Sequence, residues 1–211
     1  SLAMLVFDSN TGEKVAEHFS SSIGSGTSTY VFTVKLKPGQ RDFFFVANIP
    51  NMQTAMASIV NKSDMNHFMQ VFRDLDPIHY HNATNNNGFP MSRMYSNQTV
   101  TIGGTITQPL PFKPDGENNV KLQRVVAKLD VNIVEGVENL QKIELCNANV
   151  HYRLVPNQAE PIQFYNPVEL RRVGATNQWL GYMPEAIVES TKWWGNTGNA
   201  ENKPINFFRL T

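Results

Sequence analysis

Two-residue alternation of apolar and polar side chains constrains the fold of this chain more than any other feature of its sequence. In residues 29–36 one face is apolar, and it is formed by Tyr30, Phe32, Val34 and Leu36. A period of two with aromatic and β-branched residues is typical of a half-buried β-strand. Residues 41–48 are apolar on both faces, as in a central strand. The sequence therefore predicts a mainly β fold.

A later segment, residues 120–134, continues the alternation well beyond the usual strand length of about 5–6 residues. Its apolar face begins with Val125, Ala127 and Leu129. We expect this segment to be a long edge strand or a strand that bridges two domains.

The period changes after Pro50 to that of an amphipathic helix. Two apolar stripes at helical spacing follow, formed by Met52, Ala55, Met56, Ile59 and Val60 and then by Met65, Phe68, Met69 and Phe72. Ser63 and Asp64 provide an N-cap signal between them. We predict two short helices packed on a sheet. A ligand or partner groove lined by these stripes is the alternative to core packing.

Loop signals divide the chain into two parts. Residues 76–96 are rich in Asn, Gly and Pro and are expected to form a loop, and residues 109–119 are the best candidate for a linker. Strand patterns become sparse after residue 155. We predict two β-sandwich-like domains. Residues 1–117 would form the first, with the helical excursion, and residues 118–211 a second that the pattern leaves incomplete.

Charge and hydropathy exclude several classes of partner. The chain has 18 Lys and Arg against 18 Asp and Glu, and it lacks a basic stripe, which argues against binding of nucleic acid or anionic lipid. No apolar stretch approaches the roughly 18–20 residues of a membrane-spanning helix. The chain begins directly at a strand-like segment, so we expect a mature, trimmed or recombinant form. Cys146 is the only cysteine, which leaves no intrachain disulfide and fits a small buried residue.

Few residues suggest a metal-binding, catalytic or ligand-binding site. His79 and His81 point the same way in an extended segment and could bind zinc, but nothing marks out a third ligand, and polar loop histidines are the alternative. The chain lacks a nucleophile elbow and a phosphate-binding glycine motif. We therefore expect neither an enzyme nor a cofactor. Trp193 and Trp179 are candidates for a sugar-stacking platform, with core or domain-interface packing as the alternative.

Four motifs, in order, resemble one known family. They are Leu5-Val6-Phe7-Asp8 with Gly12, Pro38-Gly39 leading to Phe45-Val46-Ala47-Asn48, Phe89-Pro90-Met91-Ser92 before Val100-Thr101-Ile102, and the segment 120–129, VKLQRVVAKL. Their order and spacing resemble the FimA/Mfa-type fimbrillins, the subunits of type V pili in Gram-negative anaerobes.

The resemblance implies two transthyretin-like sandwiches, export as a lipid-anchored precursor, and proteolytic removal of an N-terminal strand. It also implies polymerisation by insertion of a donor strand from one subunit into the next. Phe43 and Phe45, and Val125, Ala127 and Leu129, then become candidates for strands that take part in assembly. The expected partners are other fimbrial subunits and a host or bacterial surface receptor, and the expected location is the cell surface. A carbohydrate-binding surface protein is the alternative.

Overall fold

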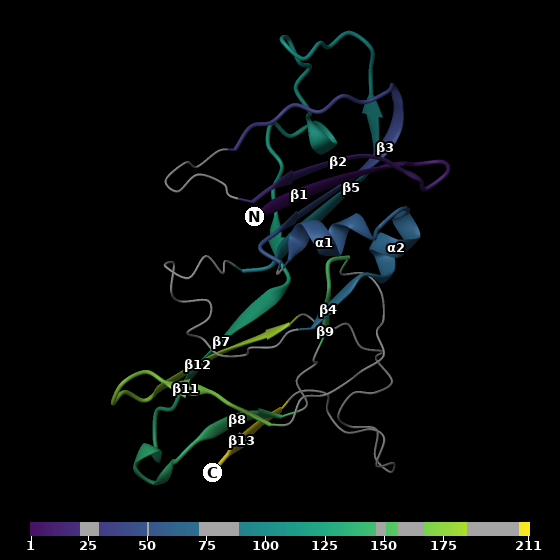
Figure 1. Ribbon diagram of the computed structural model, residues 1–211. Coiled ribbons are helices and arrows are strands. Elements are labelled where there is room, and N and C mark those ends of the chain that lie inside the picture. The colour runs from purple at the N-terminus through teal and green to yellow at the C-terminus, as the bar shows by residue number, and fades with distance from the viewer. Residues whose placement is uncertain (22–29, 50, 72–88, 147–150, 156–166, 185–206) are drawn as a thin grey trace. The chain divides into compact units, whose positions relative to one another are not determined.

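The computed structural model describes residues 1–21, 30–49, 51–71, 89–146, 151–155, 167–184 and 207–211. The chain is mainly β and forms two compact units (Figure 1). Unit 1 contains Ser1–Phe68 and Phe89–Arg124, and unit 2 contains Met69–Gly88 and Val125–Thr211. The expected linker is part of unit 1, and the expected domain boundary after residue 117 differs from this division. Among the described residues, no helix is long and apolar enough to span a membrane.

Unit 1 is built on a five-stranded antiparallel sheet with the order β2-β1-β3-β5-β6. Its strands are β1 (Leu2–Asp8), β2 (Lys14–Ser20), β3 (Gly39–Ala47), β5 (Met91–Val100) and β6 (Gln123–Arg124). As predicted, β3 is central, because β1 and β5 pair with its two edges. A short 3-10 helix, η2 (Pro114–Gly116), lies between β5 and β6.

Two short helices follow β3, as the change of period predicts, but the second is shorter than its apolar stripe. They are α1 (Met52–Ala57) and α2 (Lys62–His67), and α1 lies against β1 (Figure 1). Helix α2 ends at His67, Met69 of the stripe belongs to the strand β4 (Met69–Val71), and Phe72 lies outside the described residues.

The N-cap of α2 is Asn61, not the expected Ser63 or Asp64. Asn61 accepts from the Asp64 N–H, and the Asp64 carboxylate accepts from the Asn61 N–H, which forms a capping box.

The described residues of unit 2 form three small antiparallel sheets, with the orders β10-β8-β13, β11-β12-β7 and β4-β9. The bounds of the strands are Met69–Val71 for β4, Val126–Asn132 for β7, Ile143–Cys146 for β8, His151–Arg153 for β9, Val168–Glu169 for β10, Arg171–Arg172 for β11, Gln178–Pro184 for β12 and Phe207–Leu210 for β13. A 3-10 helix, η3 (Val137–Asn139), precedes β8. The buried residues of this unit include Ile143, Leu145, Leu154, Leu170, Trp179 and Tyr182.

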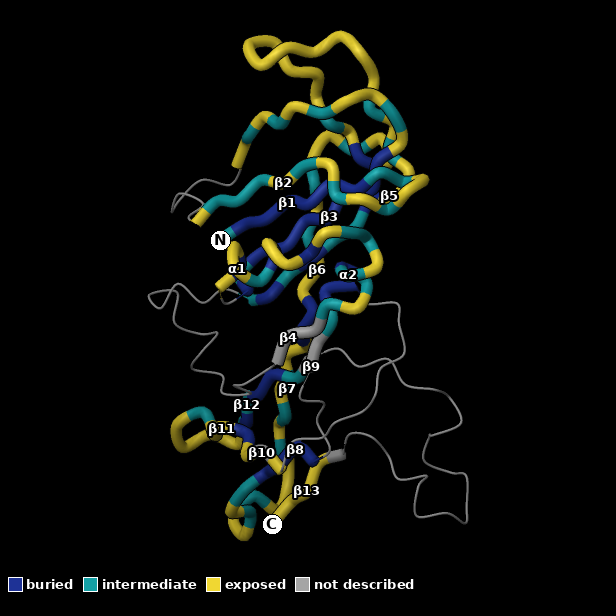
Figure 2. The backbone as a smooth tube through the Cα atoms, turned by 45° about the vertical axis from the view of Figure 1, so that its right-hand side comes forward, coloured by how far each residue is buried: buried dark blue, intermediate teal, exposed yellow. Residues whose placement is uncertain are grey.

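Three expectations for the strands are corrected. The segment 120–134 is not one strand, because it breaks at Val125 into β6 of unit 1 and β7 of unit 2. Residues 91–96, expected in a loop, belong to β5. Residues 30–36 have the predicted alternation of exposed and half-buried side chains but are not part of a ladder (Figure 2). We call these seven residues the covering segment.

Candidate assembly interface

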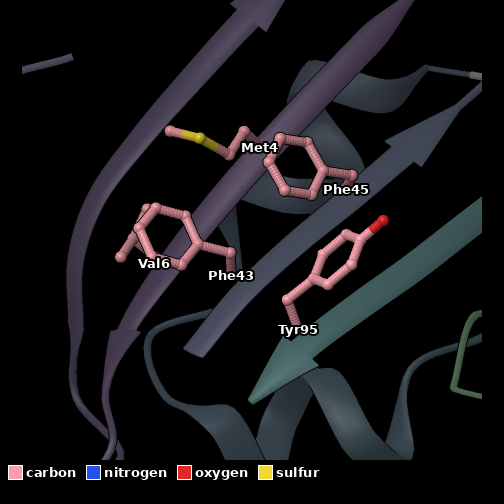
Figure 3. Packing of buried hydrophobic residues seen from close by; sticks show 5 residues of the cluster. All are labelled: Met4, Val6, Phe43, Phe45 and Tyr95. Carbon is pink, nitrogen blue, oxygen red and sulfur yellow. The ribbon is translucent and has the colours of Figure 1, made fainter. Parts of the chain in front are cut away.

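One face of the unit 1 sheet carries an aromatic and aliphatic core cluster (Figure 3). It consists of Met4 and Val6 from β1, Phe43 and Phe45 from β3, and Tyr95 from β5. All five side chains are buried. The rings of Phe45 and Tyr95 meet edge to face with centroids 6.1 Å apart, an arrangement that aromatic pairs prefer.

A second layer of half-buried side chains covers this cluster. Phe32, Val34 and Leu36 come from the covering segment, and Phe112, Val120 and Leu122 come from the connection between β5 and β6. Because every second residue of the covering segment faces the cluster, the segment packs as a strand of a sandwich would.

The backbone of the covering segment is not paired as a strand would be. Within the described part of the chain, residues 31–36 make no backbone–backbone hydrogen bond. Val31 points outward and is 82% exposed. The segment therefore offers unpaired N–H and C=O groups beside a buried apolar layer, which is the property of an edge that receives another strand.

Side chains of the sheet hold the two ends of the covering segment. At its start, the His18 ring of β2 stacks on Phe32 with centroids 4.1 Å apart, and His18 Nε2 lies 3.3 Å from the Tyr30 hydroxyl. Just beyond its end, Arg41 Nη2 donates to the carbonyls of Lys37 and Pro38 at 3.3 and 3.0 Å. These contacts fix an extended segment that has no ladder to hold it.

A buried carboxylate, that of Asp42, links several elements of unit 1. Asp42 is 1% exposed, and its oxygens accept from Lys62 Nζ at 2.5 Å, from the Asn97 N–H at 2.7 Å and from Ser9 Oγ at 2.9 Å. Burial raises the pKa of Asp42, but these hydrogen bonds outweigh it and hold the pKa below its ordinary value. The network ties β3 to α2, to β5 and to the turn after β1.

The two predicted assembly strands belong to different units of the chain. Phe43 and Phe45 lie in the core cluster, but both edges of β3 are paired, so β3 has no edge left for an incoming strand. A part for Phe43 and Phe45 in assembly stays a prediction. In unit 2, Val125 is buried, Ala127 is exposed and Leu129 is half-buried. Among the described strands β7 pairs with β12 alone, so β7 lies at the edge of its sheet there. Its part in assembly stays a prediction.

Trp179 does not provide a sugar platform. Its ring is 1% exposed within unit 2, and the Arg172 guanidinium lies over it, 5.0 Å from the centroid. A ring in this position has no face open to a sugar, so the alternative of core packing holds for Trp179. Trp193, His79 and His81 lie outside the described residues. Cys146 is buried, as expected.

No metal site is found in the part of the chain that the structure describes, where no three His, Cys, Asp or Glu side chains gather closely enough. Glu144 forms ion pairs with two basic side chains instead. In unit 2, Glu144 Oε2 accepts from Arg209 Nε at 2.7 Å and Glu144 Oε1 accepts from Lys142 Nζ at 2.9 Å. The hydrogen bond from Arg209 and then that from Lys142 lower the pKa of Glu144 to about 2. These contacts join β8 to β13.

A family model described as "Fimbrillin-A associated anchor proteins Mfa1 and Mfa2" matches residues 1–211. The chain belongs to this family. A curated family relative, the minor fimbrium tip subunit Mfa3 of Porphyromonas gingivalis, is 99% identical over all 211 residues. The chain spans about half of that relative, 47% of its length. These names describe fimbrial proteins, which confirms the resemblance to fimbrillins. The family is a non-enzymatic one.

Solved structures agree with the family assignment. The C-terminally truncated tip fimbrial protein Mfa3 of Porphyromonas gingivalis is 99% identical and superposes with a TM-score of 0.83, covering 100% of this chain and 71% of that one. A protein of Parabacteroides distasonis assigned to cell adhesion has a TM-score of 0.57 at 12% identity. That match covers 90% of this chain and 62% of the other, and it shows a shared fold alone.

Proposed function

We propose that this chain is part of a non-enzymatic structural subunit of a cell-surface fimbria in a Gram-negative bacterium. The name of the near-identical relative, a minor fimbrium tip subunit, supports this function and location. The partners that we propose are other fimbrial subunits. A host or bacterial surface receptor stays a prediction. We also propose that both units are transthyretin-like sandwiches.

We further propose that unit 1 joins its neighbour by receiving a donor strand along the covering segment. The observation that carries this proposal is the combination of half-buried alternate side chains and an unpaired backbone in residues 31–36. A strand that pairs with this edge would turn the covering layer into a hydrogen-bonded sheet.

The energetics of strand addition favour such an interface. Each backbone hydrogen bond gains about 0.5–1.5 kcal/mol net, and each apolar side chain that the donor buries gains about 1.5–3 kcal/mol. Four or five such side chains could sum to roughly 10 kcal/mol before the costs of ordering are subtracted. Among the described strands, the edge of β7 that does not pair with β12 is a second place for pairing.

A proline substitution in the covering segment tests the proposal. Thr33 is exposed, so Thr33→Pro changes no core side chain. Proline removes a backbone donor that an incoming strand requires. Because the segment is not in a ladder within the free chain, folding should be little affected. We expect Thr33→Pro to lose binding to purified fimbriae while Thr33→Ala, the matched control, binds like the wild type.

Equal binding by Thr33→Pro and Thr33→Ala, with both proteins folded by circular dichroism, would exclude the covering segment as the acceptor edge.

A further inference from the structure

An uncharged apolar loop projects from unit 1 beyond the covering layer (Figures 1 and 2). We call residues 101–111 the finger. Every residue of the finger is exposed, including its three aliphatic residues: Ile102 is 84% exposed, Ile106 76% and Leu110 52%. Soluble proteins rarely present several large apolar residues together unless the patch binds something.

The base of the finger is fixed on both sides. On one side Val100 ends β5, and on the other Phe112 lies 4.2 Å from Phe43, measured between ring centroids. Both side chains pack against the core cluster. Gln98 and Asp115 also join the two sides, through an Nε2–Oδ1 hydrogen bond of 2.9 Å and an N–Oε1 hydrogen bond of 3.0 Å.

The tip of the finger is also closed. The Thr105 N–H donates to the Gln108 carbonyl at 3.0 Å, and the Gln108 N–H donates to Thr105 Oγ1 at 2.9 Å. The two arms touch at Gly104, where an added Cβ would lie only 3.0 Å from the Leu110 backbone nitrogen. The aliphatic side chains are therefore held out on an ordered support, which lowers the entropy lost on binding.

The chemistry of the finger indicates what it binds. No charged residue lies between Arg93 and Lys113. A surface for anionic lipid would need Lys or Arg, and a membrane-interface loop would be expected to carry Trp or Tyr. A sugar platform would need an exposed aromatic ring, and the finger has none. Aliphatic and threonine side chains fit an uncharged apolar pocket on another protein, where no charge is left unpaired.

The position of the finger indicates which protein provides this pocket. The stems of the finger and the covering segment pack on the same core cluster. A subunit seated along the covering segment would therefore meet the finger too. We propose that the finger inserts Ile102, Ile106 and Leu110 into an uncharged apolar pocket of the neighbouring fimbrial subunit, next to the strand-addition site. This inference rests on the proposed function, since it takes the neighbour to be the protein that occupies the covering segment.

Dissociation from fimbriae tests the finger. Purified fimbriae of Porphyromonas gingivalis lacking this subunit are immobilised, and the dissociation rate of the added protein is measured. The test variant carries Ile102→Ser and Ile106→Ser, and Val60→Ser and Val134→Ser are the matched controls, because these valines are 63% and 88% exposed and are not part of the finger. We expect the double variant to dissociate at least about tenfold faster than the wild type, and the controls to dissociate like the wild type.

The outcomes distinguish the proposal for the finger from the proposal for the covering segment. Equal rates for the double variant and the wild type, with Thr33→Pro defective, would overturn the finger alone. A defective double variant with Thr33→Pro intact would support the finger and overturn the covering segment as acceptor. Absence of wild-type binding would overturn both. Binding of the wild type to phosphatidylcholine–phosphatidylserine vesicles, lost in Ile106→Ser, would also overturn the finger as a protein-docking element.

Discussion

Asp42 links three parts of unit 1 through one buried carboxylate. Replacing Asp42 with Ala leaves the Lys62 ammonium, the Asn97 N–H and the Ser9 hydroxyl without their partner. Lys62 is 30% exposed and can turn to water, which limits the loss. We expect Asp42→Ala to lower the free energy of unfolding by about 2 kcal/mol in urea denaturation.

The exposed pair of Lys121 and Glu117 provides the control for Asp42. Lys121→Ala should change the unfolding free energy by less than about 1 kcal/mol, since exposed ion pairs contribute little. Equal losses from the two substitutions would contradict a bracing role for Asp42.

Glu144 makes unit 2 sensitive to acid. Its pKa in the folded chain is about 2, below the ordinary 4.5, because Arg209 and then Lys142 bond to the carboxylate. A lowered pKa stabilises the fold fully above pH 4.5, and the contribution disappears as the pH falls through about 2. We expect Glu144→Gln to have a lower urea midpoint than the wild type at pH 7, with the difference shrinking between pH 4.5 and 2.

A difference in urea midpoint between wild type and Glu144→Gln that stays constant from pH 7 to pH 2 would show that the ion pairs of Glu144 do not stabilise the chain.

At the scale of elements, α1 stabilises unit 1 through the apolar stripe that its period predicts. Met52 and Met56 are buried on this helix, and Met56 is 0% exposed. Met56→Ala should lower the free energy of unfolding by about 2–4 kcal/mol, because it leaves a cavity. Val60 lies on the same stretch but is 63% exposed, so Val60→Ala should cost less than about 0.5 kcal/mol in the same denaturation experiment.

The sequence predicted those elements that carry a clear local pattern. The central strand β3, which is apolar on both faces, and the helical excursion both have this character. Strand β5 was missed because its pattern is interrupted: Ser92 and Tyr95 are both buried, although they cannot share a face in a regular strand. Packing against β3 and β6 makes it a strand, and such long-range pairing leaves no local signal.

Periodicity predicted side-chain faces better than it predicted pairing. The covering segment has the expected alternation but lacks a ladder, because pairing depends on a partner that the segment itself does not specify. The stretch 120–134 has the expected extended pattern but divides at Val125. Val125 and Val126 are both buried, so the buried face switches as the chain passes from unit 1 to unit 2.

The finger was also missed, for a different reason. Pro109 and Pro111 suggested a linker over residues 109–119, whereas Phe112 and Pro114 anchor the stretch to unit 1. Only the run without charges between Arg93 and Lys113 could have drawn attention to it, and that signal does not say whether the aliphatic side chains are buried or exposed.

At the scale of the whole molecule, the chain combines a braced five-stranded sheet with a second layer that lacks backbone pairing. The sheet and the Asp42 network supply rigidity, and the covering segment and the finger supply the exposed features. A subunit of a filament needs both properties, since it must remain folded alone and still bind a neighbour tightly. Within unit 1, the buried side chains therefore account for rigidity, and the exposed side chains account for the capacity to bind a neighbour.

Amide hydrogen exchange at residues 31–36, measured before and after incorporation into fimbriae, tests the central claim most directly. In the free chain these amides are expected to exchange rapidly, because they make no backbone–backbone hydrogen bond within the described chain. After incorporation, the alternate amides that face the donor strand should exchange at least about a hundredfold more slowly. Rapid exchange that persists in the filament, or full protection already in the free chain, would contradict strand addition at this segment.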